Sequence, residues 1–264
     1  MARRKISSEL WVALEPLIPV FMPSPKGGRH RAVDDRSALN SMLYVLQTGI
    51  PWEDLSQGLG FGSGMTCWRR LRAWQAAGVW QRLHLAMLRR LHEHDQIDWE
   101  RASLGGASVS SPGGPGSRPQ PDRSGKHGSK RHIAVDTHGI PLAVTVTGAN
   151  RHDSIAFEST LDAIPAVRGL NGQPRKRPGK LHAGKGYDFA RCRSYLRQRG
   201  IKARAARRGV ESSKRLGRYR WVVERTHAWF AGFGKLRIRF ECRLDIHVAL
   251  LLPAAAVHLL AIRG

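Results

Sequence analysis

The stretch HIAVDTHGIPLAVTVT, residues 132–147, indicates the fold class. It contains two runs of aliphatic and β-branched residues, His132–Asp136 and Pro141–Thr147, separated by a short turn at Thr137–Gly139. Two such runs joined by a few residues that include glycine are typical of a β-hairpin. We therefore predict an antiparallel pair of strands here.

Strand-like and helical segments alternate after this hairpin. In chain order we predict a helix at about 153–164, a strand at 180–183, a basic helix at about 189–199, a strand at 201–206, a helix at about 217–232 and an apolar helix at 246–262, kinked or broken at Pro253. Before the hairpin, residues 102–109 read as a strand, and the Gly-, Pro- and Ser-rich stretch 110–129 predicts a flexible loop. Strands that come first in hairpins and then alternate with helices describe a mixed α/β layer fold.

Residues 1–95 have helical periodicity throughout. Ser7 or Ser8 is placed to cap a first helix, and a second helix, preceded by Asp34 or Asp35, stops at Gly49. Helices at about 65–77 and 79–94 follow, separated by Gly78. This spacing predicts a helical region with a helix–turn–helix character.

The helix at 65–77 carries candidate contacts to DNA. Large apolar residues repeat along it at helical spacing and should face inward: Trp68, Leu71 and Trp74. Arginines between them should project elsewhere, available for phosphates or base edges in a major groove: Arg69, Arg70 and Arg72. The competing interpretation is a solvated basic face on an ordinary helical bundle.

Charge is the strongest compositional signal. The chain has 44 Lys and Arg against 20 Asp and Glu, a formal net charge of +24, and its isoelectric point is about 11.4. Because the basic residues extend along the whole chain rather than forming one tail, the excess favours a nucleic-acid partner. A genome of high GC content that favours arginine is the alternative explanation.

Cysteine usage and hydropathy exclude several other classes. The three cysteines form no CxxC pair, which argues against a zinc site and a disulfide framework and fits a reducing cytosol. The basic N-terminus lacks the apolar run of a signal peptide. The apolar stretch 246–262 is barely long enough to span a bilayer and is interrupted by His247, Pro253 and His258. We therefore expect a cytoplasmic, nucleoid-associated protein with no membrane partner.

Several sequence blocks, in order, resemble IS5-type insertion-sequence transposases. They are ALNSMLYVLQTGIPWEDL at 38–55, GSGMTCWRRLRAWQAAGVW at 62–80, ASLGGASV at 102–109, GSKRHIAVDTHGIPLAVTVTGAN at 128–150, KLHAGKGYD at 180–188 and RWVVERTHAW at 220–229. The resemblance implies an RNase H-like α/β catalytic domain at 96–264 behind a helix–turn–helix-like DNA-binding region at 1–95. It also implies binding of element terminal repeats and target DNA, cleavage and strand transfer, and no small-molecule substrate. A homo-oligomer that bridges two ends would be expected.

The family's chemistry depends on two aspartates and a glutamate, the DDE triad. Cleavage and strand transfer at phosphodiesters use two divalent cations, Mg²⁺ by expectation, whose hard character calls for carboxylate oxygens. Matched to this sequence, the glutamate is Glu224. The first aspartate position is Gly105, and the second, between LHA and KGYD, is Gly184.

Two glycines at these positions put catalysis in doubt, because glycine offers no side-chain oxygen. Glu224 alone should hold two metal ions poorly. Asp188 and Asp136 are the nearest carboxylates that could in principle substitute, although substitution would need very accurate placement. We therefore expect a chain that keeps the transposase fold and DNA affinity and has lost most or all catalysis. The alternatives are an inactive DNA-binding remnant acting at most as a repressor, a decaying pseudogene product, and an unrelated RNA-binding protein.

Three further basic residues lie beside the triad positions. Lys185 follows the second aspartate position and is either a phosphate contact or a solvated lysine. Arg220 and Arg225 flank Glu224 on its helix. By resemblance they position DNA phosphates and hold the glutamate, and otherwise they support the helix as ordinary i,i+4 partners.

Overall fold

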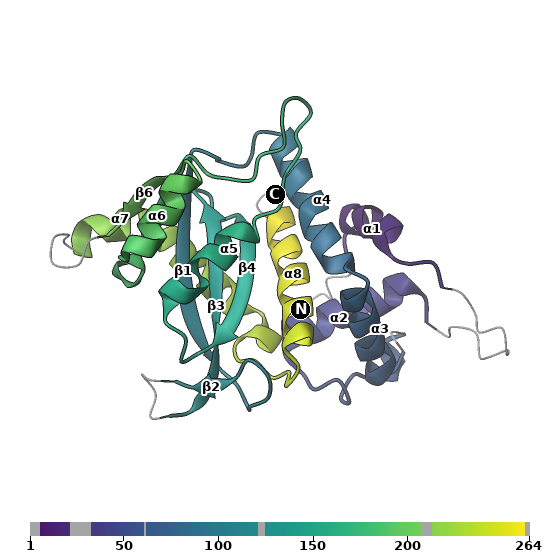
Figure 1. Ribbon diagram of the computed structural model, residues 1–264. Coiled ribbons are helices and arrows are strands. Elements are labelled where there is room, and N and C mark those ends of the chain that lie inside the picture. Colours follow the sequence, from purple (N-terminus) through teal and green to yellow (C-terminus); the bar gives the residue numbers. More distant parts are fainter. Residues whose placement is uncertain (1–5, 22–32, 61, 121–124, 207–212, 262–264) are drawn as a thin grey trace.

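A computed structural model describes residues 6–21, 33–60, 62–120, 125–206 and 213–261, and Figure 1 shows its arrangement. Its elements, in chain order, are α1 (Ser8–Leu14), η1 (Glu15–Leu17), α2 (Asp35–Thr48), η2 (Gln57–Leu59), α3 (Gly64–Ala76), α4 (Val79–Glu93), β1 (Arg101–Ser110), β2 (Arg118–Pro119), β3 (His127–Asp136), β4 (Pro141–Gly148), η3 (Asp153–Ala156), α5 (Phe157–Asp162), β5 (Lys180–Ala183), η4 (Lys185–Tyr187), α6 (Ala190–Gln198), β6 (Lys202–Ala205), α7 (Ser213–Gly232), η5 (Gly234–Leu236) and α8 (Leu244–Ala261).

The predicted hairpin is confirmed as β3 and β4, with Ile133 opposite Val144. β3 also pairs antiparallel with β1, and β1 pairs parallel with β5, which pairs parallel with β6. Across the sheet the main strands therefore lie in the order β4, β3, β1, β5 and β6. Adjacent strands among the first three are antiparallel, β5 and β6 are parallel to β1, and the short strand β2 also pairs with β3. This is the RNase H-like order that the resemblance implied.

The amino-terminal helices begin and end close to where their caps predict. Ser7 accepts from the backbone N–H of Leu10 and caps α1, and Asp34 accepts from that of Ser37 and caps α2. α2 ends at Gly49, whose φ of 80° suits a residue without a Cβ atom. The capping residues therefore predicted the ends of these helices correctly.

The C-terminal apolar stretch forms α8, which runs unbroken through Pro253. The expected break there is wrong, because residues on either side of the proline, among them Leu250, Leu251 and Ala254, are buried in the core. In Figure 1 α8 lies between the sheet and the amino-terminal helices. The core is accordingly continuous from α1 to the sheet. Among the described helices, none is long and apolar enough to cross a membrane.

The segment 110–129 is more ordered than its composition predicts. It contributes β2 and the start of β3, and it is held by Arg239, whose side chain is fully buried. The Arg239 guanidinium donates to Oγ of Ser111 and to the carbonyls of Gly113 and Pro115. The prediction of a flexible loop is therefore wrong for 110–120 and 125–129, while residues 121–124 lie outside the described part.

Candidate active site

The three triad positions meet where β1 and β5 end their pairing beneath α7. Leu104 pairs with Ala183 in parallel register, so the next residues, Gly105 and Gly184, follow side by side. The hydroxyl of Ser103 donates to the carbonyl of Tyr219, at 3.0 Å, and ties this face of β1 to α7. Glu224 lies one turn farther along α7 than Arg220.

The helix α7 packs tightly on both glycines. A Cβ atom at Gly105 would lie 2.9 Å from Cγ1 of Val223. A Cβ atom at Gly184 would lie 3.1 Å from both Cζ and Nη1 of Arg220. A guanidinium therefore lies at the position where the family has a carboxylate.

The remaining carboxylate of the triad is held weakly. Oε1 of Glu224 lies 3.5 Å from Nη2 of Arg220, and the glutamate side chain is 67% exposed. Exposed i,i+4 pairs of this kind contribute only about 0.3–0.5 kcal/mol. Nε of Arg220 is buried and has no hydrogen-bond partner among the described residues.

His182, two residues before Gly184, lies among aromatic and cationic groups. The ring of His182 packs on that of Tyr219, with centroids 4.8 Å apart, and the guanidinium of Arg101 lies 4.9 Å from the Tyr219 ring centroid. Burial, assisted by the positive charges of Arg101, Lys180 and Arg204, lowers the pKa of His182 to about 4. His182 is therefore neutral near pH 7, and Lys185 beside it is exposed.

Asp136 is a structural carboxylate, which corrects its candidacy as a metal ligand. It is fully buried. Its Oδ1 accepts from the N–H groups of His138 and Ile140, at 2.9 and 2.8 Å, and its Oδ2 accepts from that of Asp98, at 3.1 Å. Burial outweighs these donors and raises the pKa of Asp136 to about 6. Oδ1 shapes the β3–β4 turn, and Oδ2 ties the segment before β1 to it.

Asp188 faces α6, where Oδ1 accepts from Nε of Arg193 at 3.1 Å. The Asp188 carboxylate is thus engaged in an ion pair with Arg193. Within the described ranges, no group of three or more His, Cys, Asp or Glu side chains is placed to hold a metal ion. The donor set at the triad positions therefore does not fit a pair of Mg²⁺ ions.

A further carboxylate, Asp153 at the start of η3, was not anticipated from sequence. Its Oδ1 would lie 3.2 Å from a Cβ atom at Gly106, and Lys130 pairs with it at 2.9 Å. Because successive residues of a strand point to opposite faces, Asp153 lies on the face of β1 opposite to that of Gly105 and α7. It therefore does not replace the missing aspartate. In the sequence, the one feature that marks the position of Asp153 is the turn after β4, where His152 caps η3.

Two family models match the sequence of this chain. A family model described as "Transposase DDE domain" matches residues 97–259, more than half of the chain. The chain belongs to this transposase family. A second model, "Putative transposase of IS4/5 family", matches residues 6–84.

Two proteins of the Burkholderia cepacia insertion element IS402 are similar to this transposase-family chain. One, named as a transposase of the element, is 50% identical over 139 residues, 53% of this chain and 66% of that protein. The match thus spans just under two thirds of that relative's length. The other, a 16.2 kDa protein, is 49% identical over 110 residues, 41% of this chain and 75% of that protein.

Solved structures of the Mos1 transposase show only a distant likeness. A paired-end complex with the left transposon end has a TM-score of 0.26 at 13% identity, covering 84% of this chain and 82% of that one. The strand transfer complex has a TM-score of 0.28 at 11% identity, covering 88% and 81%. Values this low do not establish a common fold, which here follows from the strand order and the family match.

In the amino-terminal region of this family member, Arg70 is not available to DNA. Its guanidinium is 7% exposed, donates to the carbonyls of Val33 and Asp34 at 2.9 and 3.0 Å, and pairs with Asp35 at 3.2 Å. This corrects its place among the DNA contacts. The buried face of α3 consists of Gly64, Cys67, Arg70, Leu71 and Trp74. Trp68 is half-buried and packs against the core, as expected.

The other two arginines of α3 are exposed. Arg69 is solvent-accessible, and so is Arg72, whose guanidinium lies 5.3 Å from the ring centroid of half-buried Trp68. These two side chains therefore remain candidates for phosphate contact.

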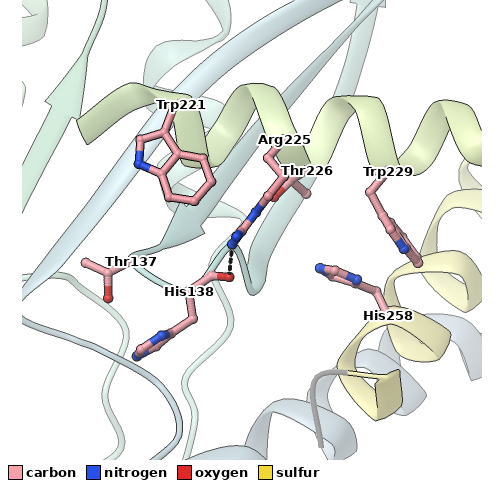
Figure 2. A pocket seen from close by; sticks show the side chains of 7 residues that line it. All are labelled: Thr137, His138, Trp221, Arg225, Thr226, Trp229 and His258. Atoms are coloured by element: carbon pink, nitrogen blue, oxygen red, sulfur yellow. Dashed lines mark hydrogen bonds between the residues drawn. The ribbon is translucent and has the colours of Figure 1, made fainter. Parts of the chain in front are cut away.

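Arg225 holds α7 against the β3–β4 turn. Its guanidinium donates to the carbonyl of His138 at 2.6 Å and lies 4.5 Å from the ring centroid of Trp221 (Figure 2). The surrounding pocket, about 590 Å³, is bounded by α7, α8 and that turn, and is lined by Thr137, His138, Trp221, Arg225, Thr226, Trp229 and His258. Arg225 thus makes a structural contact that neither expectation included, and its side chain remains exposed.

Proposed function

We propose that this chain is an insertion-sequence transposase that binds DNA at its element's ends and has lost most or all cleavage and strand transfer. The observation that carries the proposal is the pair Gly105 and Gly184, with the Arg220 guanidinium over the second. Family chemistry would need Mg²⁺ held by carboxylates at those positions. Here the single carboxylate is Glu224, which is exposed and paired with Arg220.

Electrostatics supports the DNA-binding half of the proposal. The net charge of +24 attracts a polyanion, and Arg69 and Arg72 extend from α3 into solvent. Lys185 is exposed beside the triad positions. Binding that rests on such contacts should weaken steeply as salt rises, because each neutralised phosphate releases counterions.

The decisive experiment is metal-dependent cleavage of a duplex that carries the element's own ends. The wild type is compared with the revertant Gly105→Asp/Gly184→Asp in Mg²⁺ and in Mn²⁺. We expect cleavage by the revertant and none by the wild type. Equal cleavage by both would mean that other groups hold the metals and that the proposal is wrong.

The revertant needs two controls. Glu224→Gln in the revertant background should abolish cleavage, which ties the activity to the triad. Val223→Ala in the same background makes room for the new aspartate at position 105, so an inactive revertant that becomes active with this change was limited by packing. Direct Mn²⁺ binding to each variant reports metal affinity independently of turnover.

Occupation of the element's ends without cleavage is the function that would remain, and it would at most repress active copies in the bacterial cytoplasm. The continuous core and the capped helices of the amino-terminal region support a folded DNA-binding protein. Competition between end duplexes and scrambled duplexes tests it. Equal affinity for both would favour a decaying remnant instead, and the size of the end complex would show whether two copies bridge two ends.

A further inference from the structure

We propose that a small inorganic anion, chloride, binds in the core between Arg131 on β3 and His247 on α8 and fixes α8 against the sheet. Both side chains are closed to solvent, with exposed fractions of 2% and 0%, so neither can contact DNA. The inference is therefore independent of the proposed function. It follows from buried donor groups and buried positive charge that no described side chain compensates.

Arg131 is a buried cation. Its Nη2 donates to the carbonyl of Leu236. Its Nε is buried and has no hydrogen-bond partner among the described residues. Burial lowers the pKa of Arg131 to about 10, and no carboxylate in the described part of the chain counters that effect. The guanidinium is thus still charged at neutral pH, and an unpaired charge in a protein interior is strongly destabilising.

Arg239 adds a second buried charge. The side chain is fully buried, and the acceptors that bind its guanidinium are neutral, a hydroxyl and two carbonyls within residues 110–120. These acceptors satisfy the N–H groups of Arg239 but do not neutralise its charge. The core therefore holds two guanidinium groups without a counter-ion among the described side chains.

His247, in the first turn of α8, lies near both charges. Burial, together with the positive charges of Arg131 and Arg239, lowers the pKa of His247 far below its ordinary value. The neutral ring carries a hydrogen on one nitrogen and a lone pair on the other. Both nitrogens are buried, and neither has a hydrogen-bond partner among the described residues. His247 thus offers a second buried N–H group in addition to Nε of Arg131.

The carboxylates that flank His247 in the sequence are bound to other groups. Oε1 of Glu241 accepts from Nε1 of Trp52 at 2.8 Å. Asp245 pairs with Arg243, with Oδ2 of the aspartate 2.8 Å from Nη2 of the arginine. Neither carboxylate therefore neutralises the buried charges.

An anion would supply both the acceptor and the negative charge that this cluster lacks. A buried water molecule could accept from Nε of Arg131 and from the ring of His247, but it would leave the two positive charges uncompensated. A small monovalent ion suits a site closed to solvent, because the cost of removing hydration rises with the charge of the ion. Chloride is such an ion. Bound to groups from β3 and α8, it would hold the helix on the sheet.

The test is thermal unfolding of the whole chain over a series of sodium chloride concentrations. Sodium gluconate at the same ionic strength is the reference, because any salt screens the self-repulsion of a chain with a net charge of +24. A ligand that binds only the folded state stabilises it by an amount that grows with the logarithm of its concentration above the Kd. We expect Tm to be higher in chloride than in gluconate, with a difference that increases along the series.

Two variants and a matched control tie this difference to the cluster. His247→Leu removes the ring donor and keeps an apolar side chain in the core, so it should weaken the apparent affinity for chloride about tenfold. Arg131→Met removes a buried charge as well and should abolish the difference between chloride and gluconate. Arg237→Gln lowers the net charge by the same amount at an exposed arginine and should keep the wild-type difference.

Bromide in place of chloride locates the ion in the wild type, without a variant that must fold. In a crystal grown in sodium bromide, we expect anomalous scattering within hydrogen-bond distance of Nε of Arg131 and of a ring nitrogen of His247. Water alone at that position, an equal wild-type Tm in chloride and gluconate, or a wild-type response in either variant would overturn the inference. Bromide in the crystal without a chloride response in solution would do the same.

Discussion

Val223 on α7 fills the space that a side chain at Gly105 would occupy, with Cγ1 2.9 Å from the position of a Cβ atom there. The β-branched valine has little rotamer freedom in a helix, so it cannot easily turn away. At Gly184 the nearest group is the end of the longer Arg220 side chain, at 3.1 Å. The two triad positions are therefore unequal in their tolerance of aspartate.

We predict that Gly105→Asp lowers the free energy of unfolding by about 1–3 kcal/mol, as overpacking commonly does. Gly184→Asp should have a smaller effect, because the guanidinium can move and then pair with the new carboxylate. Urea unfolding of each variant measures the difference. Adding Val223→Ala to Gly105→Asp should recover part of the loss, and a loss unchanged by it would show that packing on Val223 is not the cause.

The arginines of α3 should separate stability from DNA affinity. Arg70→Ala should lower the free energy of unfolding by about 1–3 kcal/mol, because it removes the donor to the carbonyls of Val33 and Asp34 and the ion pair with Asp35. Arg69→Ala and Arg72→Ala should leave stability nearly unchanged and weaken binding to DNA. Thermal unfolding of the three variants measures their stability, and titration with a DNA duplex measures their affinity.

The opposite pattern, a stable Arg70→Ala protein with weakened DNA binding at unchanged fold, would restore Arg70 as a DNA contact. Arg70→Lys is the informative control. It keeps the charge but lacks the forked donors that reach two carbonyls, so it should be only partly stable.

Local chemistry predicted most of the secondary structure, and long-range packing explains what it missed. The hairpin 132–147 and the caps at Ser7 and Asp34 depend on residues within a few positions of one another. Arg70 was misplaced because its burial depends on carbonyls 36 and 37 residues away. A polar residue on a buried helical face does not show in a pattern of apolar residues.

The candidate site could be predicted only in part for the same reason. The positions 105, 184 and 224 follow from resemblance, and the proximity of the first two follows from the β1–β5 register. That Arg220 lies over Gly184, and that Asp153 lies against Gly106, depends on how α7 and η3 pack on the sheet. Sequence spacing carries no information on that packing.

Arg239 should control the order of the Gly-, Pro- and Ser-rich segment after β1. Its guanidinium is fully buried and binds Ser111 and the carbonyls of Gly113 and Pro115. We predict that Arg239→Ala exposes residues 110–120 to proteolysis, because the segment has few apolar contacts of its own. Limited digestion with mapping of the first cuts tests this, and cutting at the wild-type rate would contradict it. Arg237→Ala, at an exposed arginine two residues earlier, is the control.

His132 should make stability fall in acid. The residue is 1% exposed, and its Nε2 lies 2.9 Å from the hydroxyl of Thr147. Burial lowers the pKa of His132 from 6.5 to about 4. The folded state therefore binds a proton on His132 less readily than the unfolded state does. The contribution of His132 to the free energy of unfolding is fully present above pH 6.5 and is lost as pH falls toward 4.

For His132 alone, the loss in the free energy of unfolding should approach about 3 kcal/mol. His182 and His227, whose pKa values are likewise lowered to about 4, chiefly by burial, should add to it. Urea unfolding between about pH 7 and pH 4 measures the slope. His132→Gln, which keeps a polar group near Thr147 but cannot titrate, should be less stable at neutral pH and less sensitive to acid. A slope equal to that of the wild type would show that His132 is not protonated on unfolding in this range.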